Sequence, residues 1–564
     1  MVLKQSKDQL GPSQTEINSV IALYSNGKIQ EALNTVEALI KDYPNEPLLF
    51  NISGACYASL GQFDRAVRFY NQALLIKPDY AQAHYNLAGT LQELGQLDAA
   101  VKSYEKSLAI NPDYAEAHNN LGNVLKDLEQ LDAAVKSYKN AIAIKPDYVE
   151  AHYSLGNTHQ ELGQLDDAVK SYKEVIDIEP DFAEMHNNLG VILKELNQKD
   201  AALKSLERAV AIKPGFAEAH NNLGNILKDL YQLDSSVKSY EKALALKPDY
   251  VDAHYNLGGA FKDLGQLEAA VKSYEKAVAL KPDYADGHYN LGGAFKDLGQ
   301  LEAAVKSYEK AVAHKPDYAE AHNNLGSVLK EQGQLDAAIK YYDHAMELKP
   351  DIYFTFGELL HTKMQLCIWD DLSNQLDDLK NKINNSKKVI NPFPLLALID
   401  DPELQMKTAE IFVNEKYPQS HVLSKIERYP KHKKIRIGYF SGDFHNHATM
   451  HLMAELFECH DKLCFELIAF SFGPNKQDQW RQRAFLSFDK FVDVRLKSDR
   501  EISLLARKME IDIAIDLKGY TRNCRPNIFA EGCAPIQVNY LGYPSTMAAS
   551  YMDYLIADRT LIPE

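Results

Sequence analysis

The sequence predicts an all-α array of helical repeats followed by an α/β lobe. Two observations lead to this fold class. Prolines recur at a constant interval of 34 residues, at positions 44, 78, 112, 146, 180, 214, 248, 282, 316 and 350. From about residue 434 onward, short apolar segments with strand character alternate with helical patterns. A fixed period of this length is typical of stacked helix pairs, so we expect a superhelix with a long concave groove.

Each repeat has the composition of a helical hairpin. In residues 81–112, apolar residues at helical spacing form two faces, which Gly95-Gln96 separates and Pro112 ends. A column of small residues would let the paired helices approach closely, and its members are Ala88, Gly122, Gly156, Gly190, Gly224, Gly258, Gly292 and Gly326. The repeat resembles the tetratricopeptide (TPR) family over residues 14–353, in about ten copies.

One histidine per repeat forms a second column: His84, His118, His152, His186, His220, His254, His288 and His322. Metal ligands must converge at about 2 Å from one ion, whereas successive repeats lie roughly 10 Å or more apart. We therefore interpret these histidines as structural or groove-lining and predict no metal site among them.

One asparagine per repeat forms a third column: Asn86, Asn120, Asn188, Asn222, Asn256, Asn290 and Asn324, with Ser154 filling the gap. An amide both donates and accepts hydrogen bonds, so a ladder of amides suits the backbone of an extended peptide. The alternative is that asparagine is simply common at this position in TPR sequences. Peptide binding in the groove is the functional interpretation.

Composition and charge argue against several classes of protein. The net charge of −16 argues against a general nucleic-acid binder, which needs a basic face. No apolar run approaches the ~20 residues of a membrane span, and the first residues lack a signal-peptide pattern. Six cysteines without a CxxC pair predict no disulfide framework. We therefore expect a cytoplasmic protein with reduced thiols.

After the repeats, residues 354–430 read as a helical transition segment and residues 431–564 as a Rossmann-like lobe with a parallel sheet. Candidate strands are residues 435–441, 465–472, 488–494, 511–517, 536–541 and 551–557. Candidate helices are residues 450–460, 479–484 and 500–509.

Three polar loops follow predicted strands, at the edge where open α/β sheets bind ligands. They are residues 441–451, 516–525 and 540–546. The first holds three histidines, an aspartate and a threonine, which would suit a metal site, acid/base chemistry or sugar binding. No second cluster has metal-ligand spacing. The second loop is cationic and suits a phosphate or an acidic group, and the third has a glycine that allows close backbone approach to a ligand.

Specific motifs in these loops resemble the O-linked N-acetylglucosamine transferase family, to which the plant SPINDLY group belongs. They are Arg436 through Thr449, Gly519-Tyr520-Thr521 and Ala534 through Pro544. A TPR array ahead of such a lobe is the arrangement of that family. The resemblance implies the first half of a GT-B glycosyltransferase, inverting and metal-independent. It would transfer a sugar from a nucleotide sugar, with UDP-GlcNAc expected, to Ser or Thr of proteins held in the TPR groove. It implies no cofactor.

The resemblance also assigns roles. His447 and Asp443 fall on the family's pocket histidine and proton-relay aspartate, and are thus implied to be catalytic. The implied substrate-binding residues are Thr449, Tyr520, Arg522, Arg525, Leu541 and Gly542.

Departures from the family leave alternatives open. Ala448 stands where animal members have proline, and Phe393 is nearest to a histidine of animal members, so the donor sugar is GlcNAc or fucose. The family's second lobe, which binds uridine, does not follow within the sequence, so we expect the chain alone to be inactive. A TPR scaffold with an inactive lobe is the alternative function. The repeats also allow a homo-oligomer.

Overall fold

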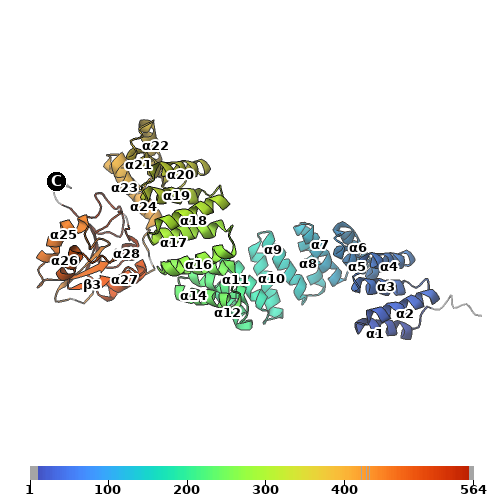
Figure 1. The fold of residues 1–564 in the computed structure, drawn as a ribbon. Helices are drawn as coiled ribbons and strands as arrows, with labels where there is room; N and C mark the ends of the chain where they lie inside the picture. Colours follow the sequence, from blue (N-terminus) through green and yellow to red (C-terminus); the bar gives the residue numbers. More distant parts are fainter. Residues whose placement is uncertain (1–10, 421, 427–428, 431, 522, 558–564) are drawn as a thin grey trace, which may run out of the picture. The chain divides into compact units, whose positions relative to one another are not determined.

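The computed structural model describes residues 11–420, 422–426, 429–430, 432–521 and 523–557 (Figure 1). Contacts divide the chain into two units, residues 1–230 and 231–564. The helices of the first unit are α1 (Gln14–Ser25), α2 (Ile29–Asp42), α3 (Pro47–Ser59), α4 (Phe63–Ile76), α5 (Ala81–Glu93), α6 (Leu97–Ile110), α7 (Ala115–Asp127), α8 (Leu131–Ile144), α9 (Val149–Glu161), α10 (Leu165–Ile178), α11 (Ala183–Glu195), α12 (Lys199–Ile212) and α13 (Ala217–Asp229).

The second unit continues the repeats and then changes architecture. Its repeat helices are α14 (Leu233–Leu246), α15 (Val251–Asp263), α16 (Leu267–Leu280), α17 (Ala285–Asp297), α18 (Leu301–His314), α19 (Ala319–Glu331) and α20 (Leu335–Leu348). Four helices without the 34-residue period follow: α21 (Thr355–Gln365), α22 (Leu372–Asn384), α23 (Pro392–Leu398) and α24 (Pro402–Lys416).

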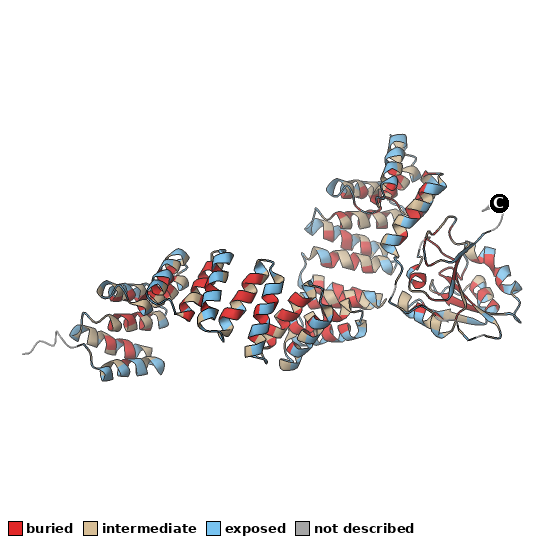
Figure 2. Ribbon diagram, turned by 180° about the vertical axis from the view of Figure 1, so that it is seen from behind, coloured by how far each residue is buried: buried red, intermediate tan, exposed pale blue. Residues whose placement is uncertain are grey.

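Helix pairs form where the period places them because small residues face large rings. A Cβ atom built on Gly122 would lie 2.6 Å from the ring of Tyr138 on the paired helix, closer than carbon atoms can approach. Tyr138 itself is fully buried, as are the tyrosines at the same position of other repeats. The buried faces of successive helices therefore turn toward one another within each unit (Figure 2).

The histidine column closes the turns between repeats. In each case Nε2 lies 2.9–3.0 Å from the carbonyl oxygen of the proline six residues earlier, as between His84 and Pro78 or His322 and Pro316. A carbonyl only accepts, so Nε2 donates and the ring is in its Nε2–H form. These bonds give the histidines a structural role, which is one of the two roles that the sequence left open.

The lobe holds one parallel sheet in the order β3-β2-β1-β4-β5-β6. Its strands are β1 (Ile435–Ser441), β2 (Phe465–Ser471), β3 (Lys490–Asp493), β4 (Ile513–Asp516), β5 (Ile536–Tyr540) and β6 (Tyr554–Ile556). Its helices are α25 (Ala448–Cys459), α26 (Gln479–Ser487), α27 (Asp499–Lys508) and α28 (Asn527–Ala530). The predicted fold class is confirmed, and the short helix α28 is an addition.

Helices cover both faces of the sheet. Phe457 of α25 and Ala484 of α26 pack on one face with Leu467, while Ile502 of α27 and Phe529 of α28 pack on the other. The crossover helices after β1 and β4 thus lie on opposite faces, which opens a crevice between these strands at their carboxyl ends. Within the described residues, no helix is both long and apolar enough for a membrane crossing.

Candidate functional site

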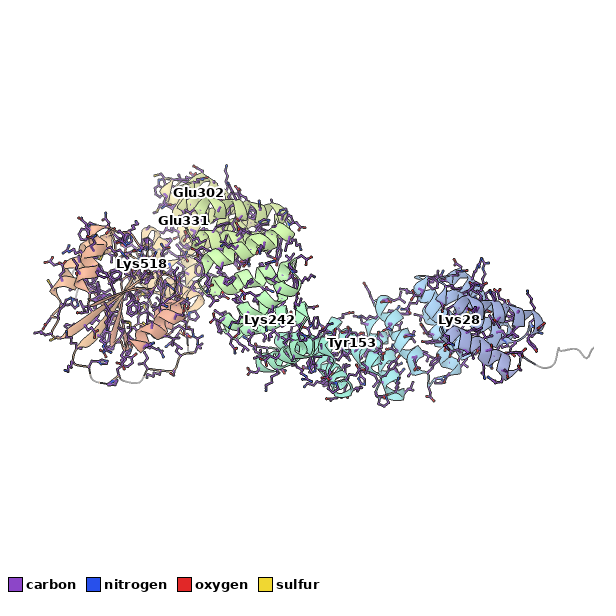
Figure 3. The ribbon with its side chains drawn as sticks, turned by 60° about the horizontal axis from the view of Figure 1, so that its bottom comes forward. Lys28, Tyr153, Lys242, Glu302, Glu331 and Lys518 are labelled. Atoms are coloured by element: carbon purple, nitrogen blue, oxygen red, sulfur yellow. The ribbon has the colours of Figure 1, made fainter. Side chains whose placement is uncertain are left out.

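Two loops meet at the crevice between β1 and β4. Asp443 follows β1, and Lys518, which Figure 3 labels in the lobe, follows β4. The Lys518 ammonium lies 2.8 Å from Oδ2 of Asp443. Both side chains are largely buried, with 7% and 11% of their surfaces exposed. A buried carboxylate needs such a partner, because an unpaired charge costs several kcal/mol to desolvate. The pair fixes the centre of the site.

Two further side chains converge on the same carboxylate oxygen. The hydroxyl of Thr449 and Nδ1 of His447 each lie 3.5 Å from Oδ2 of Asp443. His447 Nδ1 and the Thr449 hydroxyl are 3.1 Å apart. We call Asp443, His447, Thr449 and Lys518 the β1–β4 cluster. It unites three of the residues that the sequence singled out.

His447 also begins α25. Its Nδ1 accepts a hydrogen bond of 3.2 Å from the backbone N–H of Thr449, so the side chain caps the helix. A nitrogen that accepts carries no proton, so the neutral ring has its proton on Nε2. The His447 side chain is 44% exposed. The cap therefore leaves Nε2–H as the group for a ligand.

The loop after β4 is organised by Asp516. Its carboxylate accepts hydrogen bonds of 2.9 and 3.0 Å from the backbone N–H groups of Lys518 and Gly519. Burial raises the pKa of Asp516 from 3.8 to about 6, against these hydrogen bonds, which act to lower it. Asp516 thus places Lys518 without entering the site itself.

A cavity of about 1230 Å³ opens from the β1–β4 cluster toward the last repeats. Among the residues that the sequence analysis selected, those lining it are Asn324, Asp443, His447, Thr449, Tyr520 and Gly542. Asn323, Lys330 and Glu331 of α19 line its other end. One space is therefore shared by the repeats and the lobe within the second unit.

Two predicted substrate contacts have other partners. Arg525 bonds the carboxylate of Asp499 and the carbonyls of Val494 and Lys497, and it does not line the cavity. Tyr520 is buried and donates its hydroxyl to the carbonyl of Met547 at 2.6 Å. Arg522 lies outside the described residues. The roles predicted for these three side chains stay predictions.

The third loop is held tightly against the second. A Cβ atom on Gly542 would lie 2.0 Å from the carbonyl oxygen of Leu517, so only glycine fits there. The space next to Gly542 that we expected a ligand to approach is thus filled by the backbone at Leu517. Leu541 has a left-handed backbone with φ 65°, which is strained for leucine. Its side chain packs on the core and does not line the cavity.

The asparagine column pairs from one repeat to the next. Asn120, Asn290 and Asn324 donate to the hydroxyls of Tyr85, Tyr255 and Tyr289, at distances of 2.6–3.0 Å. Asn86 and Asn222 donate to the amide oxygens of Asn51 and Asn187, and Asn188 accepts from Asn187. Asn256 also has a partner. These amides are fixed in orientation, and part of their donor capacity is used inside the array.

Sequence reasoning missed Lys518 as a site residue. The loop was predicted to belong to the site, but its arginines were chosen as the ligand-binding residues because guanidinium groups suit a phosphate. The signal was available: β1 and β4 are neighbours in the common order of such sheets, so residues just after both strands must meet. Metal ligation finds no support in the described part of the chain, where no three His, Cys, Asp or Glu side chains cluster suitably.

Comparison with known proteins now adds to this geometry. Residues 404–564 match glycosyl transferase family 41. This match takes in the whole lobe and the end of the segment before it. TPR models match eight segments between residues 54 and 333, and residues 319–352 match a further tetratricopeptide repeat. The chain is thus a TPR array joined to a family-41 domain, and the β1–β4 cluster lies inside the family-41 match.

Individual relatives carry related names. A probable UDP-N-acetylglucosamine–peptide N-acetylglucosaminyltransferase of Arabidopsis thaliana, SEC, is 32% identical over 220 residues, which cover 36% of this chain and 22% of that protein. The enzyme of that name from Caenorhabditis elegans is 37% identical over 132 residues, or 23% of this chain and 12% of that protein. The chain therefore spans less than a quarter of the length of either relative.

A solved structure of a Thermobaculum terrenum O-GlcNAc transferase mutant is 25% identical. The two structures align over 56% of this chain and 54% of that chain, with a TM-score of 0.37.

Proposed function

We propose that this protein takes part in transfer of N-acetylglucosamine from UDP-GlcNAc to Ser or Thr of other proteins. One observation carries the proposal: a cluster within the family-41 match, built on Asp443 and His447, opens into the same cavity as Asn323 and Asn324 of the last repeat. A protein segment lying along the repeats can therefore present its hydroxyl to the cluster. The names of the relatives supply the donor and the acceptor class.

In the proposed reaction, the acceptor hydroxyl oxygen bonds to the anomeric carbon while the bond between that carbon and UDP breaks. The exposed Nε2–H of His447 orients the hydroxyl by donating a hydrogen bond to its oxygen. The hydroxyl proton passes to the carboxylate of Asp443. Lys518 holds that carboxylate in place with a bond of 2.8 Å. His447 could act as the base only after giving up its cap on α25.

The rest of the proposal follows from the same chemistry. The donor is a substrate, and no cofactor or metal takes part in the proposed steps. Acceptor proteins are the partners of the repeats, and the cytoplasm is the proposed location because UDP-sugar donors and reduced thiols fit that compartment. Association of the repeats into a homo-oligomer is compatible with this function.

The test is transfer of radiolabelled sugar to acceptor proteins by the protein expressed from its full open reading frame. UDP-GlcNAc and GDP-fucose are supplied in parallel reactions. Labelling from UDP-GlcNAc supports the proposal. Labelling from GDP-fucose alone corrects the donor. Binding of acceptors without labelling from either donor overturns the proposal in favour of a TPR scaffold.

A further inference from the structure

A continuous series of aromatic rings runs through the junction between the last repeat and the lobe. Neighbouring ring centroids are 6.5, 5.4, 5.1, 5.5 and 6.4 Å apart. The rings, in order, are Tyr353, Phe354, Phe412, Tyr520, Tyr543 and Phe393. We call this series the aromatic belt. All of its members except Tyr543 line the cavity described above.

The belt is buried in its middle and exposed at its ends. Phe354, Tyr520 and Tyr543 are 4–6% exposed, whereas Tyr353 is 51% and Phe393 is 48% exposed. The ammonium of Lys388 lies over the Tyr353 ring, 4.3 Å from its centroid. Within the described residues, no cation covers the ring of Phe393. Phe393 is therefore the apolar surface that the belt leaves open to the cavity.

Phe393 is also held rigidly. It stands between Pro392 and Pro394 in the first turn of α23, and proline fixes the backbone on both sides. The preceding Asn391 donates to Glu358 at 2.7 Å, and Glu358 is paired with Lys330 of the last repeat at 2.7 Å. Because the backbone that carries this exposed ring is fixed, little backbone entropy is lost when a ligand covers the ring.

We propose that Phe393 determines acceptor specificity by receiving an aliphatic side chain next to the reactive Ser or Thr. This inference rests on the proposed function and deepens it. An extended segment that pairs with Asn323 and Asn324 and presents its hydroxyl to the β1–β4 cluster must pass through the shared cavity. The side chain beside that hydroxyl can reach Phe393, because Phe393 lines this cavity together with His447 and Gly542.

The observations favour a peptide side chain over the donor sugar at this ring. A sugar platform combines an aromatic face with polar groups that bind the hydroxyls. The Phe393 side chain has no polar atom, and Tyr543, whose ring it contacts, is buried. Asp443, Thr449 and Lys518 are bonded within the β1–β4 cluster, and the Nε2–H of His447 meets the acceptor hydroxyl in the proposed reaction. An apolar side chain gains from such a surface by leaving water.

The experiment measures binding of two fluorescent peptides to the 564-residue chain by fluorescence anisotropy. Both peptides contain a central serine, flanked by valine in one and by serine in the other. We expect the valine peptide to bind roughly tenfold tighter, since an isopropyl group buried on an aromatic ring contributes that order of affinity. Phe393→Ala should abolish the difference, and Phe393→Leu should retain most of it. Phe485→Ala is the matched control, because Phe485 is an exposed phenylalanine of α26 outside this cavity.

Two results would overturn the proposal. The first is equal binding of the two peptides by the wild-type chain. The second is a valine preference that survives Phe393→Ala. If Phe393→Ala keeps the preference and also loses affinity for N-acetylglucosamine, the ring is assigned to the sugar. Peptide binding requires no transfer, so failure of the transfer assay and failure of this proposal are distinguishable.

Discussion

The repeats and the lobe pair their polar side chains in different ways. In the repeats, one contact recurs at each step, as between His84 and Pro78 or between Asn120 and Tyr85. In the lobe, the decisive contact occurs once and joins Asp443 to Lys518, 75 residues away. The repeats distribute their polar pairing over many equivalent bonds, whereas the ion pair of Asp443 and Lys518 is largely buried and has no equivalent elsewhere in the described part of the lobe.

This difference predicts where each region is vulnerable. Loss of one bond in the array leaves its equivalents in other repeats intact, because each repeat stacks only on its neighbours. Loss of one partner in the lobe leaves a charge buried with no substitute. Substitutions in the lobe cluster should therefore cost more than single substitutions in the ladder, and the following predictions test that ranking.

The largest effect is expected for Lys518→Met. It leaves the largely buried carboxylate of Asp443 without its cation, so we expect a loss of ~3–5 kcal/mol in the free energy of unfolding. Urea unfolding followed by tryptophan fluorescence measures it, since Trp480 packs in the core of the lobe. The double variant Lys518→Met with Asp443→Leu should recover most of the loss. Equal stability of Lys518→Met and the wild type would refute the ion pair as the centre of the site.

A smaller loss is expected for Gly122→Leu. The new side chain collides with the ring of Tyr138, already 2.6 Å from the first added carbon, and overpacking of this kind costs ~1–3 kcal/mol. Thermal unfolding followed by circular dichroism measures the change. Gly215→Ala is the control, because nothing lies within 4 Å of its added carbon. If both variants unfold at the wild-type temperature, helix packing does not depend on the small column.

A single ladder bond should matter less. Removal of the Asn290 amide by Asn290→Ala breaks the hydrogen bond to the Tyr255 hydroxyl, with an expected cost of ~0.5–1.5 kcal/mol. Tyr255→Phe breaks the same bond. A double-mutant cycle of the two should give a coupling energy of that size. Additive effects would mean that the bond adds nothing to stability, and that the recurring asparagines serve ligand binding alone.

The smallest effect is a pH dependence spread over the histidine column. Burial lowers the pKa of His84, His288 and His322 below 6.5, and their Nδ1 atoms are buried without partners. Just below pH 6.5 these histidines are protonated in the unfolded chain but stay neutral in the folded chain, because their pKa values are lower there. Stability should thus fall as pH drops through 6.5 and stay level above it. Unfolding midpoints at about pH 7.5 and about pH 5.5 measure this. Replacement of the three by glutamine should flatten the profile.

The sequence predicted the regular repeats more completely than it predicted the contacts of the lobe. A constant proline interval fixes the position of every repeat, so the helix pairs followed directly, whereas the bond between His84 and Pro78 needed the structure. Strand β1 was placed at Ile435–Ser441, as observed, because apolar β-branched and aromatic residues mark it. The partner of Asp443 could not be predicted from the sequence, because strand order decides which loops meet and the sequence alone does not specify that order. The partners of Arg525 did not follow for the same reason: the carboxylate of Asp499 and the carbonyl of Lys497 come from the segment after β3.

The central claim is that the β1–β4 cluster acts on an acceptor hydroxyl in a sugar transfer, and substitution of His447 tests it most directly. Transfer of radiolabelled GlcNAc by the protein expressed from its full open reading frame is compared for the wild type, His447→Ala and His447→Gln. His451→Ala is the control, because His451 lies on the same helix and bonds Asn446 instead. We predict a loss of ~10²–10⁴-fold for alanine, a smaller loss for glutamine, which keeps a donor, and no loss for His451→Ala. Wild-type rates in His447→Ala would contradict the account.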